Sequence, residues 1–227
     1  MALQVLPYAV EDYNSLPELR VAKDQFESAR ASEILFTEIG KALVEHHVEN
    51  TLGITLLHNH FLLEHHEMLV NVDSVAVPWD ATSGATELVG VKASAWRFTD
   101  PGLAPYEFAH TAVEVSLDCR PMQSFLLELA AILKKWNLTN ILGLCSLGAK
   151  SLDGPATMEF TSGRANITLP FDIAPNDGNT IDAMWQFSSD PLSSSVHAGP
   201  KCPGQRNPNS VRDPFKADRP IFRSRGW

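Results

Sequence analysis

The chain has 227 residues, of which 44% are hydrophobic, and a formal net charge of −9. This length suits one large domain with a full core, and the negative charge argues against non-specific binding of nucleic acid over the whole surface. No run of about 18 apolar residues predicts a membrane span, and we expect no secretion signal, because the first residues lack its basic and apolar regions. Three widely spaced cysteines without a Cys-x-x-Cys pair favour a reduced, cytoplasmic protein.

The first fifty residues are predicted to be helical. Ser15-Leu16-Pro17-Glu18 has the spacing of a capping box, in which a hydroxyl and a carboxylate cap the first turn of a helix. Leu35, Ile39 and Leu43 recur at helical spacing, so a second helix is predicted over residues 32–48.

Strand-like segments follow, because short apolar runs alternate with turn residues. Asp100-Pro101-Gly102 and Ser162-Gly163 are two of the turn signals, and the second predicts a hairpin. The predicted strands cover residues 52–63, 68–77, 87–98, 107–117, 141–145, 158–161, 164–169 and 181–187.

One long amphipathic helix, predicted over residues 121–136, interrupts these strands. Pro121 opens it, and apolar residues from Met122 to Trp136 form one stripe along it. Strands and helices do not alternate as βαβ units. We therefore predict the α+β class, with a curved or barrel-like antiparallel sheet that helices cover on one face. A single domain is expected over residues 1–190.

Residues 191–227 differ in composition from the rest of the chain. They hold six of the fifteen prolines and seven basic residues against two acidic ones, a formal charge of +5, whereas residues 1–190 hold 11 basic and 25 acidic residues, a charge of −14. This composition predicts a Pro-rich basic tail that is extended or disordered. The alternative is an arm that docks on the acidic body of its own or a neighbouring subunit, which would make a homo-oligomer.

Four of the chain's eight histidines fall within nine residues. Imidazole is the side chain that best moves protons near neutral pH, and it is also the commonest metal ligand. Alternate side chains of a strand share one face, so His58, His60 and Glu64 are expected to point together. His110 and Glu114 share a face of the strand predicted over residues 107–117, and that strand could lie opposite.

The pattern His58-x-His60-x-x-x-Glu64 resembles the first motif of the cupin family, whose histidines and glutamate bind a metal inside a β-barrel. The resemblance implies that these three residues are metal ligands and that His110 replaces the family's fourth ligand. The preceding glycine is one position too close, Asn71 stands where a later glycine is expected, and the second motif is absent. We therefore do not assign the chain to the cupins.

A second resemblance covers three short segments. Residues 56–61, 158–161 and 183–187 resemble patterns in uncharacterised small fungal proteins. This resemblance implies an intracellular fungal protein, with a role in secondary metabolism, but it brings no established activity.

An enzyme is favoured over a binding protein, and its substrate is expected to be a small natural-product-type molecule. The leading hypothesis is a non-redox cyclase, isomerase or lyase without a nucleotide cofactor, because the chain has no glycine-rich phosphate-binding motif. His58 or His60 would be the general acid or base, and Glu64 or Glu114 would orient its ring.

Two other functions stay open. One is a metal-dependent enzyme that holds Zn, Fe, Mn or Cu through His58, His60 and a third ligand such as Glu64 or His110. The other is a non-catalytic binding or assembly protein that docks through its basic tail. A purely structural role for the histidines, satisfied by hydrogen bonds inside the core, is the alternative to all catalytic hypotheses.

Overall fold

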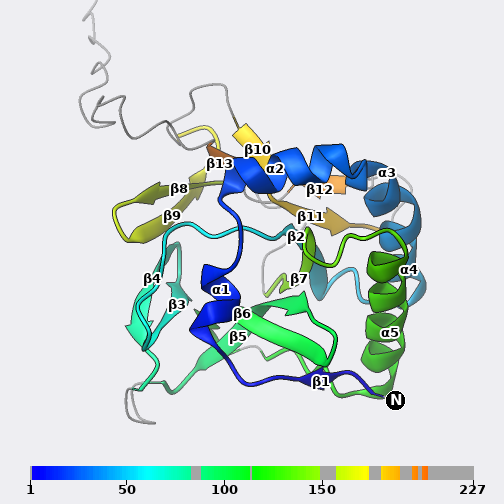
Figure 1. Cartoon of the computed structure of the whole chain (residues 1–227), viewed down its shortest axis with the longest axis horizontal. Coiled ribbons are helices and arrows are strands. Elements are labelled where there is room, and N and C mark those ends of the chain that lie inside the picture. The colour runs from blue at the N-terminus through cyan, green and yellow to red at the C-terminus, as the bar shows by residue number, and fades with distance from the viewer. Residues whose placement is uncertain are drawn as a thin grey trace, which may run out of the picture.

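The structure is a computed structural model that describes residues 2–82, 88–112, 114–148, 157–173, 180–189, 196–198 and 201–203. The chain has an α+β fold, as predicted, with a strongly curled and mostly antiparallel sheet flanked by helices (Figure 1). Most of the predicted tail lies outside the described residues. Residues 196–198 and 201–203 of it form two short strands that pair with the sheet.

The helices are concentrated in the first fifty residues and in one later segment. They are α1 (Val10–Asn14), α2 (Leu19–Ser28), α3 (Ala31–Ile34), the π-helical turn η1 (Leu35–Ile39), α4 (Gly40–Glu45) and α5 (Arg120–Lys135). The long helix predicted over residues 121–136 is confirmed as α5, and the helix predicted over residues 32–48 is composed of α3, η1 and α4. No helix in the described ranges is both long and apolar enough to cross a membrane.

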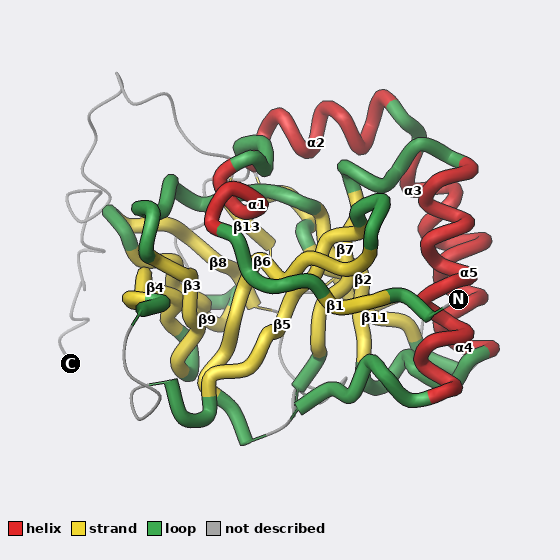
Figure 2. The backbone as a smooth tube through the Cα atoms, turned by 60° about the horizontal axis from the view of Figure 1, so that its bottom comes forward, coloured by secondary structure: helices red, strands yellow, loops and turns green. Residues whose placement is uncertain are grey.

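The strands of the described residues belong to one sheet. They are β1 (Gln4–Val5), β2 (Leu52–Leu56), β3 (Glu67–Val72), β4 (Val75–Asp80), β5 (Val91–Phe98), β6 (Gly102–His110), β7 (Leu142–Ser146), β8 (Thr157–Ser162), β9 (Ala165–Pro170), β10 (Thr180–Asp182), β11 (Met184–Phe187), β12 (Val196–Ala198) and β13 (Lys201–Pro203). Their order is β10-β13-β8-β9-β4-β3-β6-β5-β7-β2-β11-β12, and β1 pairs with β6. The sheet curls so that the β3–β4 and β8–β9 hairpins lie on the side away from α3, α4 and α5 (Figure 2).

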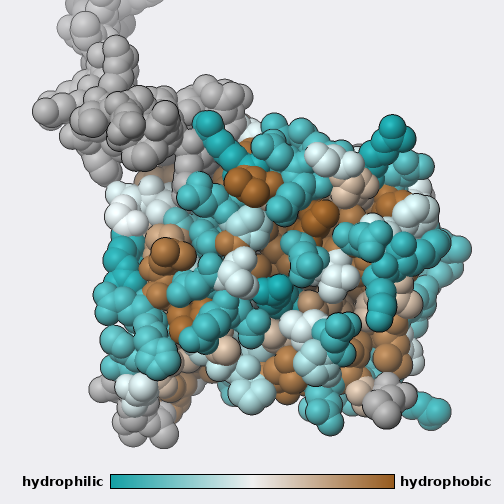
Figure 3. Space-filling view, in the orientation of Figure 1, coloured by the Kyte–Doolittle hydropathy of each residue, from teal (hydrophilic) through white to brown (hydrophobic). Residues whose placement is uncertain are grey.

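Alternation along the central strands separates an apolar face from a more polar one. On β2, Leu52, Ile54 and Leu56 are buried in the main hydrophobic core, which also contains Phe125 of α5. Each such side chain contributes roughly 1.5–3 kcal/mol when it is fully buried. Thr55 lies between them in the strand and points to the opposite, concave face. The side of the molecule seen in Figure 3 carries small hydrophobic patches separated by hydrophilic residues.

The strand predicted over residues 52–63 is wrong beyond Leu56. The Leu57 N–H makes a last bond beside β7, to the carbonyl of Ile141, and after it the backbone leaves the sheet, so that the Asn59 N–H donates to the carbonyl of Pro17. His58 and His60 therefore lie on a loop, residues 57–66, and not on a strand.

Further strands differ from the prediction: the one over residues 87–98 begins at Val91, as β5, and the one over residues 181–187 is divided into β10 and β11. The segment 68–77 is a hairpin of β3 and β4, because Asp73 adopts a left-handed conformation with φ of 57° and turns the chain. The strand predicted over residues 107–117 begins and ends earlier, as β6. Thr99 and Gly102 exchange backbone hydrogen bonds in a tight turn, so the strand starts at Gly102 directly after it.

Candidate functional site

The concave side of the sheet encloses a cavity of about 480 Å³. Such a volume accommodates a small organic molecule. Strands β2, β3 and β5–β8, together with loop 57–66, contribute to its lining. The side chains in the lining that can carry chemistry are His58, His60, Tyr106, Glu107, Cys145 and Glu159. Asp73 and His110 are exposed members of the lining and mark its rim.

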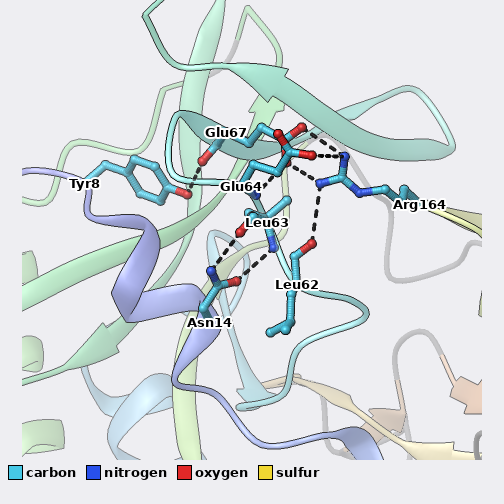
Figure 4. Close-up of polar contacts among 7 residues, drawn as sticks. All are labelled: Tyr8, Asn14, Leu62, Leu63, Glu64, Glu67 and Arg164. Atoms are coloured by element: carbon cyan, nitrogen blue, oxygen red, sulfur yellow. Dashed lines mark hydrogen bonds and ion pairs between the residues drawn. The ribbon is translucent and has the colours of Figure 1, made fainter.

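Loop 57–66 is held on one side by the N-terminal segment (Figure 4). The side-chain amide of Asn14 donates to the Leu63 carbonyl and accepts from the Leu63 N–H, both at 2.9 Å. The Tyr8 hydroxyl donates to the backbone carbonyl of Glu67 at 2.7 Å, where β3 begins. Two side chains from the first fourteen residues thus hold the end of the loop.

Arg164, in the β8–β9 turn, holds the loop from the other side (Figure 4). Both terminal nitrogens of its guanidinium donate to the Glu67 carboxylate, and one also donates to the Leu62 carbonyl at 3.4 Å. The Arg164 hydrogen bond is the main cause of the lowered pKa of the Glu67 carboxyl. Glu67 also accepts from the Glu64 N–H at 2.7 Å, so this carboxylate joins the loop to the hairpin.

His58 is buried, and its orientation is set by its own backbone. Nδ1 lies 2.8 Å from the Leu56 carbonyl. Since a carbonyl can only accept a hydrogen bond, the ring proton is on Nδ1, and Nε2 carries the lone pair of the neutral ring. Burial lowers the pKa of His58, although the hydrogen bond to Leu56 and the charge of Glu159 oppose that shift.

His60 lies against His58, with the ring centroids 4.8 Å apart and the rings nearly perpendicular. Its backbone N–H donates to the hydroxyl of the fully buried Tyr13 at 3.1 Å. Burial, and then the neighbouring His58, lowers the pKa of His60 well below its ordinary value. Both imidazoles are therefore neutral at neutral pH.

Two carboxyl groups face the same nitrogen of His60. Nε2 is 4.0 Å from Glu107 Oε1 and 3.9 Å from Glu159 Oε2. Both glutamates line the cavity, and their side chains are only 29% and 18% exposed. Burial, and then the charge of Glu159, raises the pKa of Glu107 to about 8, so this carboxyl group keeps its proton at neutral pH.

Asn166 joins His60 to Glu159. Its Nδ2 donates to Glu159 Oε2 at 3.1 Å and lies 3.2 Å from His60 Nε2. In this arrangement His60 Nε2 accepts, which places the proton of the neutral ring on Nδ1. Oδ1 of the same amide is buried without a hydrogen-bond partner among the described residues.

The structure brings together only part of the predicted site. His58 and His60 lie side by side in the cavity, and His110 stands at its rim with an exposed side chain. Glu64 is two-thirds exposed and lies 3.8 Å from Arg164, outside the cavity lining. Glu114 follows the end of β6, is also exposed, and pairs with Lys92 at 2.9 Å. Neither glutamate contacts the histidines.

The predicted metal set of His58, His60, Glu64 and His110 is therefore not assembled. Within the described ranges, no group of three or more His, Cys, Asp or Glu side chains has an arrangement that could hold a metal ion.

Sequence reasoning missed Glu107, Glu159 and Asn166. Glu107 began a predicted strand and Glu159 lay in a predicted hairpin, so both were visible in the sequence as acidic residues of predicted strands. Their convergence depends on the order of the strands in the curled sheet, which no local pattern predicts.

Compared with known proteins, the chain matches no family model, no curated protein and no solved structure. Any assignment of function therefore depends on the chemistry of this site.

Proposed function

We propose that the cavity binds a small organic molecule and catalyses a non-redox proton-transfer reaction: an isomerisation, an elimination or a cyclisation. One observation carries the proposal, namely that two buried imidazoles and a largely buried carboxyl group line the same cavity, where burial favours the uncharged form of each. Environments that push the pKa values of two groups in opposite directions are typical of an acid–base pair working at neutral pH.

In this proposal His58 is the general base. Its Nδ1–H is held by the Leu56 carbonyl, so Nε2 can take a proton from a C–H or O–H group of the substrate. Glu107 is the general acid, because it carries a proton that it can give to a developing oxyanion or leaving group. Both groups are in the required protonation state before the substrate binds.

His60 connects the acid and the base. Its ring contacts His58 and its Nε2 is 4.0 Å from Glu107 Oε1, so in this proposal one water molecule bridges that gap and the proton taken by His58 returns to Glu107 after each turnover. Asn166 and Tyr13 hold this ring in place through the bonds described above. A reaction of this kind requires positioning and one proton donor more than it requires a cofactor.

The experiment measures base-catalysed ring opening of 5-nitrobenzisoxazole, a small apolar probe that gives a coloured phenolate when a base removes its C–H proton. We expect wild-type protein to accelerate the reaction above a buffer of matched basicity. His58→Ala is expected to lose about 100-fold or more of that acceleration, which is the contribution of a positioned base. His60→Ala should lose less.

Three controls accompany this assay. Glu114→Gln removes an exposed carboxyl group outside the cavity and should leave the rate unchanged. Circular dichroism of each variant separates loss of chemistry from loss of folding, and a folded His58→Ala variant with the full wild-type rate would contradict the proposal. Elemental analysis of the same samples tests the metal-dependent alternative, since stoichiometric metal that disappears in His58→Ala/His60→Ala would replace the metal-free mechanism.

A further inference from the structure

The Glu107 carboxyl group lies in the cavity wall without a hydrogen bond to any of the described residues. Its contact with His60 Nε2 is 4.0 Å long, which is beyond hydrogen-bonding distance. The side chain is 29% exposed, and that exposed part faces the cavity, because Glu107 belongs to the lining. A carboxyl group that keeps its proton here can donate its O–H to a molecule in the cavity.

The side chains around Glu107 on the concave face are small and mostly apolar. Ala95 lies directly opposite it on β5, and Cys145 of β7 lies opposite Ala95, so the three side chains share one face. Ala109, two residues further along β6, and Ala183 also line the cavity. Because an alanine side chain ends at Cβ, these residues leave room beside the carboxyl group for the apolar body of a ligand.

Neither an anion nor a cation is the best partner for this carboxyl group. None of the described lining residues is a lysine or an arginine that could pair with an anion. A protonated carboxyl group offers no charge to a cation, and burial, followed by the charge of Glu159, keeps the proton in place by raising the pKa of Glu107 to about 8. An uncharged hydrogen-bond acceptor therefore suits Glu107 best.

We infer that the substrate of this cavity is an uncharged carbonyl compound with an apolar body, whose carbonyl oxygen accepts a hydrogen bond from Glu107. A hydrogen bond to that oxygen stabilises the charge that develops on it when a proton is removed from the neighbouring carbon. His58 and Glu107 both lie next to His60, so a molecule in contact with the acid is also close to the base. This inference rests on the proposed function, because it names the class of molecule for the same site.

The chemistry that follows is the formation of an enol. Nε2 of His58 takes a proton from the carbon beside the carbonyl group, and the electron pair of that C–H bond forms the C=C bond. The π pair of the C=O bond moves to the oxygen, which takes the proton of Glu107. The products are the enol, a cationic His58 and a Glu107 carboxylate, and the relay through His60 returns the proton from His58 to Glu107.

The test compares 1-indanone with indane, which has the same two rings and no carbonyl group. Their dissociation constants are measured by NMR at neutral pH, from the imidazole signals of His58 and His60, in the wild type and in Glu107→Met. Methionine keeps the length of the side chain and removes the donor. We expect 1-indanone to bind about tenfold more weakly to the variant, since its carbonyl group loses its hydrogen bond, and indane to bind no more weakly.

Two further variants are the controls, and a second measurement reports the hydrogen bond itself. Glu107→Gln keeps an N–H donor at the same position and should weaken 1-indanone less than Glu107→Met does. Glu114→Met replaces an exposed carboxyl group outside the cavity and should change neither affinity. In infrared difference spectra, the carbonyl stretch of bound 1-indanone should lie at a lower frequency in the wild type than in Glu107→Met.

The outcomes separate this inference from the proposed function. Equal responses of 1-indanone and indane to Glu107→Met would overturn the inference, as would the same carbonyl frequency in both proteins or tighter binding of 1-aminoindane, a cation of the same shape. If neither 1-indanone nor indane shifts the histidine signals, the inference is wrong, and the assay with 5-nitrobenzisoxazole decides the proposed function by itself. If that assay fails while 1-indanone binds through Glu107, recognition of the carbonyl group stands and only the proposed reaction is wrong.

Discussion

The two faces of the central strands differ in the chemical character of their side chains. On the face toward α5, Leu52, Ile54 and Leu56 meet other apolar residues in a continuous core. On the concave face, Thr55 of the same strand borders a cavity with histidines and carboxyl groups. One strand thus takes part in two environments of opposite character, and the period of two along the strand separates them.

This contrast indicates where the molecule is stabilised and where it keeps reactive groups. Apolar burial on the face toward α5 favours folding. On the concave face, burial shifts the pKa values of His58, His60 and Glu107 toward their uncharged forms, which disfavours folding at some pH values. The stability gained by apolar burial on the face toward α5 can therefore offset the cost of burying ionisable groups on the concave face.

The largest loss of stability is expected when a core side chain is truncated on the face toward α5. Phe125 is fully buried, and Phe125→Ala should lower the free energy of unfolding by about 3–5 kcal/mol. Leu127, on the same helix and 44% exposed, is the control, and Leu127→Ala should change stability by about 0.5 kcal/mol or less. Urea unfolding followed by tryptophan fluorescence measures both. Equal losses in the two variants would mean that α5 does not pack as described.

The next effect is a pH dependence of stability, and it is caused by Glu107 on the concave face. Glu107 has an ordinary pKa of 4.5 and a folded-state pKa of about 8, so between these values the folded state holds a proton that the unfolded state has released. Stability therefore falls as the pH rises through this window, by at most about 1.4 kcal/mol per pH unit. The histidines act in the opposite sense, because their lowered pKa values remove stability as the pH falls below 6.5.

Glu107→Gln isolates this contribution. The variant cannot ionise at this position, so its stability should exceed that of the wild type by a margin that grows from about pH 4.5 to about pH 8 and then stays constant. Glu114→Gln, at an exposed position, provides the control for losing a carboxyl group. Denaturant unfolding across this pH range measures the margin, and a margin independent of pH would show that Glu107 titrates as an ordinary glutamate.

Local patterns in the sequence were sufficient to predict the elements with strong periodicity. The apolar stripe of α5 and the Ser162-Gly163 turn predicted a helix and a hairpin that the structure confirms. The α+β class followed from the order of these elements. His58 and His60 were identified because imidazoles are rare in an apolar run, and that signal remained useful even though the predicted strand was wrong.

The rest of the site depends on contacts between distant residues. Glu107 and Asn166 are 47 and 106 residues from His60, and they approach it only because the sheet curls. Glu64 was chosen on the assumption that alternation continues past Leu56, but the backbone leaves the sheet there and the Asn59 N–H donates to the Pro17 carbonyl. A period of two has no meaning once the strand has ended.

A smaller loss of stability is expected from a substitution at Gly143, next to the point where loop 57–66 leaves the sheet. A Cβ atom at Gly143 would lie 2.6 Å from a methyl group of Leu57 and 2.8 Å from the Trp96 carbonyl oxygen. Gly143→Ala should therefore lower stability by about 1–3 kcal/mol, because backbone and side chain must both shift. It should also change the NMR signals of His58, which follows Leu57 directly. Unfolding by urea and the histidine spectrum measure the two effects, and unchanged values of both would mean that β7 and the loop are not in close contact.

The smallest effect on stability is expected from Arg164, although its effect on the loop should be clear. Arg164→Ala removes a partly exposed guanidinium, which contributes about 1 kcal/mol or less to stability. The lowered pKa of Glu67 means that this contribution is present at neutral pH and is lost as the pH falls through the folded-state pKa.

In the Arg164→Ala variant, amide hydrogen exchange should become faster in residues 62–66, and ligands of the cavity should bind more weakly. Lys92→Ala, which also breaks an exposed ion pair, should leave exchange in the loop unchanged. If Arg164→Ala had no more effect on the loop than Lys92→Ala, then the contacts of Asn14 with Leu63 would be sufficient to hold the histidines.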